Sequence, residues 1–129
     1  MIWELGYPFD GKMIMRKRKS FRRKLLGQPN LMEKKIAILG GSTTHDIKEI
    51  LELFLLNYGI KPIFFESEYA QYWQDAMFGN EGLSALKPDI IYIHTSNRNI
   101  TAFPEITDTI EEIDVLLEQQ YMHFETMWE

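Results

Sequence analysis

The chain has 129 residues, 45% of them hydrophobic and 26% charged, with a formal net charge of −5 at pH 7, so we expect a soluble globular protein. The lack of cysteine excludes a disulfide framework, a thiol nucleophile and a cysteine-based zinc site. The sequence has no apolar run of membrane-spanning length, no signal peptide and no grouped histidines, so we predict a cytoplasmic protein without a metal, cofactor or membrane partner.

The first part of the chain is basic and the rest is acidic. Residues 1–35 carry ten Lys or Arg against three acids, and residues 12–26 have the spacing of an amphipathic helix that Gly27 ends. Its basic side is interpreted as a solvated face or as a face that meets the chain's own acidic helix. The negative net charge and the lack of a nucleic-acid motif argue against nucleic acid as a partner. We therefore divide the chain into a basic helical extension, 1–34, and an α/β domain, 35–129.

The domain opens with an apolar run, residues 36–39, that is typical of a strand covered on both faces. Two glycines follow, and then Thr43 and Asp46 have capping-box spacing for a helix that Gly59 ends. The apolar stripe predicted for that helix is Ile47, Ile50, Leu51, Phe54 and Leu55.

Further strands are predicted at residues 60–65 and 89–94, with short helical segments between them. After Pro104 comes the clearest helical periodicity in the chain, with a strongly acidic polar face. Its apolar positions are Ile106, Ile110, Ile113, Leu117, Tyr121, Phe124 and Trp128.

Three strands that alternate with helices predict right-handed crossovers and a parallel sheet in the order 2-1-3. Ligands of such sheets bind at the carboxyl ends of the strands, where the loops 40–44, 66–69 and 95–99 are expected to meet. The third strand would be an apolar edge, which is usually covered or paired. We therefore expect either a second copy at this edge or a truncated chain, and the abrupt end of the last helix favours truncation.

Five segments in order resemble the amino-terminal domain of FkbH-like proteins, in which an SGNH-hydrolase-like domain precedes a haloacid-dehalogenase-type phosphatase domain. These segments are residues 36–44, 51–56, 59–62, 65–69 and 87–95. The resemblance implies a flavodoxin-like three-layer α/β/α fold and a part in loading glyceryl units onto an acyl carrier protein. The Asp-rich phosphatase motif is absent from this sequence, so the chain is not the whole of that activity.

The resemblance also implies roles for residues. Gly40-Gly41-Ser42 matches the Gly-Asp-Ser block that holds the nucleophile of SGNH hydrolases, with glycine in place of aspartate. Asn97 matches the asparagine of the oxyanion hole. The Asp-x-x-His block that supplies the general base has no counterpart, so the base is not identified.

Ser42 therefore has three interpretations: a nucleophile, a ligand anchor, or a helix cap together with Thr43 and Thr44. Without the Gly-Lys-Ser/Thr ending, the turn is not a phosphate loop of the Walker type.

Four further residues are candidates for binding. Glu66 and Glu68 alternate after the second strand and face opposite ways, so one of them can hydrogen-bond to the turn at Ser42. His94 is either a base or a packed, hydrogen-bonded residue at a strand end. Arg98 lies in a loop where it can hold a phosphate or a carboxylate.

Two functions are consistent with these patterns. The first is transfer of an acyl or glyceryl group to or from an acyl carrier protein, or ester hydrolysis, with Ser42 and Asn97 as the catalytic residues. The alternative is a non-catalytic module that docks a carrier protein or a phosphatase domain of the haloacid-dehalogenase type, steered by the basic helix.

Overall fold

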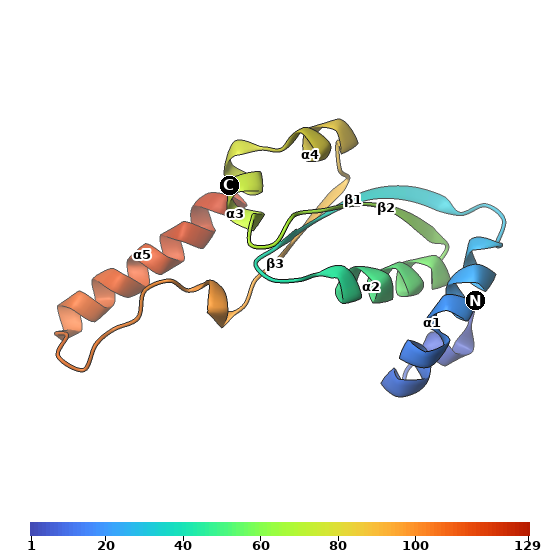
Figure 1. The fold of residues 1–129 in the computed structure, drawn as a ribbon, viewed down its shortest axis with the longest axis horizontal. Helices are drawn as coiled ribbons and strands as arrows, with labels where there is room; N and C mark the ends of the chain where they lie inside the picture. The colour runs from blue at the N-terminus through green and yellow to red at the C-terminus, as the bar shows by residue number, and fades with distance from the viewer.

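Strand β1 (Met32–Gly40) lies at the centre of the fold and pairs in parallel with β2 (Ile60–Glu66) on one side and β3 (Ile90–His94) on the other. The computed structural model, which describes residues 1–129, therefore confirms the predicted order 2-1-3 (Figure 1). Ile36, Ala37, Ile38 and Leu39 are all buried, as expected for a strand that is covered on both faces.

Helices cover both faces of this sheet. Helix α2 (His45–Asn57) connects β1 to β2, whereas α3 (Tyr72–Phe78) and α4 (Glu81–Leu86) connect β2 to β3. The two crossovers run in opposite directions across the sheet, so their right-handedness places them on opposite faces. The result is the α/β class and the three layers that the sequence predicts, and it is consistent with a flavodoxin-like fold (Figure 1).

The basic helix α1 (Gly11–Leu26) packs against α2. Asp10 caps its start by accepting a hydrogen bond from the backbone N–H of Met13 at 3.0 Å. The contact with α2 is an apolar cluster of buried side chains: Leu5, Ile14, Phe21, Leu25, Leu53 and Leu56. Strand β1 begins at Met32, so the boundary placed between residues 34 and 35 falls inside a strand.

Packing of α1 also changes which side of α2 is buried. Leu53 and Leu56, which face α1, are fully buried, whereas all five residues of the predicted stripe are only partly buried. The periodicity of α2 alone identifies an apolar helix but not the second helix that covers one of its sides.

Helix α5 (Ile110–Trp128) begins four residues later than Ile106, with a capping box formed by Thr109 and Glu112. Only the last part of this helix, with Phe124 and Met127, packs near α3. The rest of the helix extends beyond the sheet (Figure 1). The predicted apolar stripe is therefore largely exposed, and Ile106 lies outside the helix.

Strand β3 is an exposed apolar edge, as predicted, with Ile90 and Ile91 each about half exposed (53% and 52%). Helices α1 and α5 lie at opposite ends of the molecule, so the basic face does not meet the acidic helix of its own chain (Figure 1). None of the helices combines the length and apolar composition needed to cross a membrane.

Candidate functional site

The three predicted loops meet at the carboxyl edge of the sheet. The backbone N–H of Gly41 donates to the carbonyl oxygen of His94 at 2.8 Å, which ties the end of β1 to the end of β3. On the other side, the N–H of Ser67 donates to the carbonyl oxygen of Ile38 at 2.9 Å. The turn after β1 is therefore held from both neighbouring loops.

Both glycines of this turn are required by close approach. A Cβ on Gly40 would overlap the side chain of Thr44 and the carbonyl oxygen of Ser42. A Cβ on Gly41 would overlap the side-chain amide of Asn99. Gly41 thus leaves room for a side chain from the loop after β3.

Two residues that hold the turn were not among the candidates from the sequence. The buried Oγ of Ser67 accepts a hydrogen bond from the N–H of Gly40 at 2.9 Å. Asn99 donates through Nδ2 to the carbonyl oxygen of Gly41 at 3.1 Å, and its Oδ1 accepts from the N–H of Ser96 at 2.8 Å. The spacing of Ser96 and Asn99 is that of a capping box and was a signal for Asn99. No pattern in the sequence points to Ser67.

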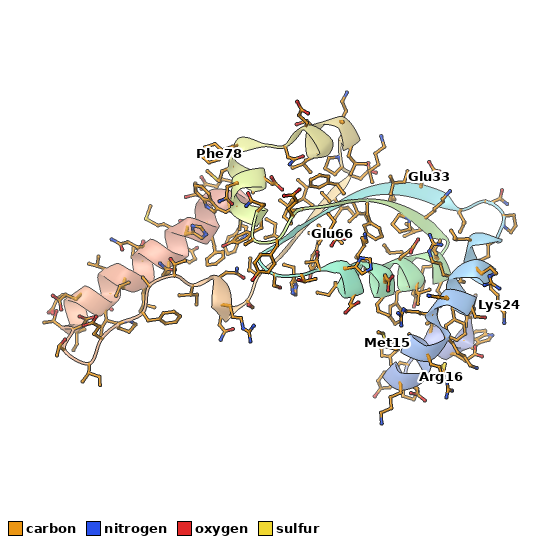
Figure 2. The ribbon with its side chains drawn as sticks, viewed as in Figure 1. Met15, Arg16, Lys24, Glu33, Glu66 and Phe78 are labelled. Carbon is orange, nitrogen blue, oxygen red and sulfur yellow. The ribbon has the colours of Figure 1, made fainter.

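Glu66 links the end of β2 to the start of α2 and lies between the sheet and this helix (Figure 2). Its carboxylate accepts a hydrogen bond from Thr44 Oγ1 at 3.2 Å and forms an ion pair with Lys48 Nζ at 2.8 Å. Burial raises the pKa of Glu66, but the hydrogen bond and charge of Lys48, together with Thr44, outweigh this effect and bring the pKa below its ordinary value. The contact expected from a glutamate to Ser42 is not formed, because Glu66 accepts from Thr44 instead.

Helix α2 begins at His45 with Thr44 as the N-cap residue, one position later than the predicted start at Thr43. The hydroxyl of Thr44 points to Glu66 and makes no capping bond. The first backbone N–H groups of α2 are thus left without a side-chain acceptor at the carboxyl edge of the sheet. Such groups favour an anion or a developing negative charge.

Ser42 is half-buried in this turn, and its hydroxyl forms no hydrogen bond. Each histidine is engaged elsewhere: Nε2 of His45 lies 3.3 Å from Glu49, Nδ1 of His94 lies 3.1 Å from the hydroxyl of Tyr92, and Nε2 of His123 lies 3.1 Å from that of Tyr72. Ser42 therefore has no paired general base.

The remaining candidates lie around the turn with free side chains. Thr43, Glu68, Asn97 and Arg98 are exposed, and the side chains of these four residues form no hydrogen bond or ion pair. Asn97 begins the 3-10 helix η2 (Asn97–Asn99), but it is Asn99 that contacts the turn. The role of Asn97 as an oxyanion donor stays a prediction.

The uncapped N–H groups at the start of α2 and the free hydroxyl of Ser42 can hold an anionic or acyl group at this edge. No three His, Asp or Glu side chains come together in a geometry for a metal ion. Comparison of the chain with protein-family models, with curated proteins and with solved structures gave no match.

Replacing Ser67 by alanine is expected to destabilise the protein by about 1–3 kcal/mol, because the buried N–H of Gly40 loses its acceptor. Chemical denaturation measures this change in the free energy of unfolding. The matched control is Ser84→Ala, at an exposed serine of α4, which is expected to stay within about 0.5 kcal/mol of wild type. Equal stability of the two variants would contradict the assigned role of Ser67.

From the Glu66–Lys48 ion pair we predict a loss of stability in acid that depends on the carboxylate of Glu66. A carboxyl group whose pKa is lowered in the folded state contributes stability above its unfolded pKa and loses it as the pH falls through the folded pKa. The pKa of Glu66 is lowered from the ordinary value of 4.5. As the pH falls from about 6 through that value and then through the lowered pKa, the free energy of unfolding should decrease more in the wild type than in Glu66→Gln. Denaturation at several pH values tests this, and Glu68→Gln, which removes an unpaired carboxylate, should keep the wild-type pH dependence.

Proposed function

We propose that this chain is the SGNH-like domain of an FkbH-like protein and acts as a non-catalytic docking module for an acidic acyl carrier protein. The observation that carries the proposal is a row of unpaired cations on α1. This helix has eight Lys or Arg and no acid, and only Arg18 and Arg22 form ion pairs, with Glu49 and Glu52 of α2.

The cations of the row share one side of the helix. They recur at intervals of four, three and four residues, which brings them onto the face opposite the buried Ile14, Phe21 and Leu25. The members of the row, all exposed, are Lys12, Arg16, Lys19 and Arg23. Such a row attracts an acidic helix and raises the rate of encounter with it.

A cleft leads from this row towards the turn at the sheet edge. It has a volume of about 620 Å³ and lies between α1 and α2. Its charged lining residues on α1 are Lys19, Arg22 and Arg23, and those on α2 are Lys48, Glu49 and Glu52, with His45 beside them. The two acids pair with Arg18 and Arg22. A carrier seated on α1 would find Lys19 and Arg23, the two cations of this cleft that form no ion pair, for the phosphate of its prosthetic arm, with the acyl or glyceryl end directed towards Ser42.

Reversing two charges of the row tests docking directly. Arg16→Glu combined with Arg23→Glu is expected to weaken binding of an acyl carrier protein at least about tenfold at low salt, as measured by calorimetric titration. The matched control, Lys17→Glu with Lys24→Glu, makes the same change of charge on the same helix but outside the row, and it should weaken binding much less. Equal losses in both variants, or no binding by the wild type, would count against the proposal.

A second candidate function is acyl or glyceryl transfer, or ester hydrolysis, by Ser42. It is favoured by the place of Ser42 directly after the central strand, where its free hydroxyl lies next to the uncapped start of α2. The lack of a paired base is the reason to rank it second.

A turnover assay separates the two functions. With a short-chain ester or an acyl-carrier thioester, we expect the wild type and Ser42→Ala to show equally low turnover, because no base activates the hydroxyl. Circular dichroism of both proteins checks that the folds are the same. Turnover in the wild type that Ser42→Ala abolishes would establish the enzyme and displace the docking module.

A further inference from the structure

Two apolar surfaces at opposite ends of the molecule are largely exposed. The first is on α5, where residues at intervals of seven, four and seven positions share one helix face. These residues, between 52% and 75% exposed, are Ile110, Leu117, Tyr121 and Trp128. An exposed apolar line of this kind on a helix marks an interaction surface.

The second surface is an open groove along α1 and α2. Two hollows of about 450 and 460 Å³ share Ile50 and Phe54 and so form one continuous groove. Its apolar lining residues are Phe9 just before α1, Ile14 and Met15 in α1, and Ile47, Ile50, Leu51 and Phe54 on α2, and Asp46 at the start of α2 also lines it. The rings of Phe9 and Phe54 pack edge to face with their centroids 5.5 Å apart, which fixes these two side chains at the side of the groove. Figure 2 shows Met15 near the start of α1.

The charges beside the two surfaces are opposite. Helix α5 has five acidic residues and no Lys or Arg. Two of the acids, Asp114 and Glu118, lie four and eight residues after Ile110, directly beside the apolar line. On α1, Lys12 and Lys19 lie three residues before and four after Met15, so they flank Met15 at the rim of the groove, on the side away from Ile14, and neither forms an ion pair. An acidic amphipathic helix therefore matches the groove in polarity and matches the charge of the rim beside Met15, while Asp46 at the start of α2 is the one acid that lines the groove.

We infer that α5 of one copy of this chain lies in the α1–α2 groove of a second copy, and that the second copy returns the same contact. Within one molecule α5 cannot reach the groove, because α1 and α5 lie at opposite ends (Figure 1). Two copies placed side by side in opposite directions satisfy both contacts at once, and a two-fold axis closes the assembly as a dimer. Pairing of α5 with α5 would instead bring acid against acid.

A charge exchange between the two helices tests this dimer in the chain alone, independently of any carrier protein. One variant reverses the basic side, Lys12→Glu with Lys19→Glu, and the other reverses the acidic side, Asp114→Lys with Glu118→Lys. All four positions are exposed, so the fold should be kept. In sedimentation velocity at low salt, the wild type is expected to be a dimer and each variant a monomer, with dimerisation at least about tenfold weaker.

An equimolar mixture of the two variants is the deciding sample, because each then offers the other an oppositely charged partner at both contacts. We expect the mixture to recover the dimer. The control Lys17→Glu with Lys24→Glu, on α1 away from the groove, should remain dimeric. A monomeric wild type, a dimer that ignores both exchanges, or a mixture that stays monomeric would overturn the inference.

Discussion

Burial of β1 between two parallel strands and two layers of helices is the constraint on which the rest of the structure depends. The four apolar residues 36–39 are accessible from neither face, and their backbone groups are shared between β2 and β3. Because all three strands run in the same direction, their carboxyl ends form one edge. The turn at Gly40 must then fit between two other loops, so it has little space for side chains. Glycines fit this space. Ser67 accepts a hydrogen bond from the N–H of Gly40, and Asn99 donates one to the carbonyl oxygen of Gly41.

The same constraint explains why the edge brings free polar groups together without a paired base for Ser42. Parallel topology brings Ser42, Glu66 and the start of α2 together whatever their chemistry. Glu66 forms an ion pair with Lys48 and accepts a hydrogen bond from the hydroxyl of Thr44, so its negative charge is already neutralised within the structure. The backbone N–H groups of α2 and the hydroxyl of Ser42 remain free, and these can hold a group but cannot withdraw a proton. An arrangement of this kind suits binding better than nucleophilic attack.

Prediction from sequence succeeds where periodicity and glycine placement are local. The sheet order, the strand that ends at Gly40 and the convergence of three loops follow from the alternation of strands and helices. It fails where a distant element decides the outcome. The side of α2 that carries Leu53 is buried only because α1 lies over it. Ser67 is a buried acceptor only because β2 ends beside Gly40, and nothing in its neighbours in the sequence marks that position.

The separation of charge along the chain is also a property of the fold. A basic first part and an acidic last part would attract each other in a flexible chain, yet the sheet holds α1 and α5 at opposite ends (Figure 1). Attraction that the fold prevents within one molecule acts between molecules, and only at short range at physiological salt. A row of cations on α1 and an acidic apolar line on α5 are then two ends of the same charge pattern. An element that satisfies the basic end, such as the proposed carrier protein or the proposed second copy, must itself be acidic, so both proposals depend on this one separation of charge.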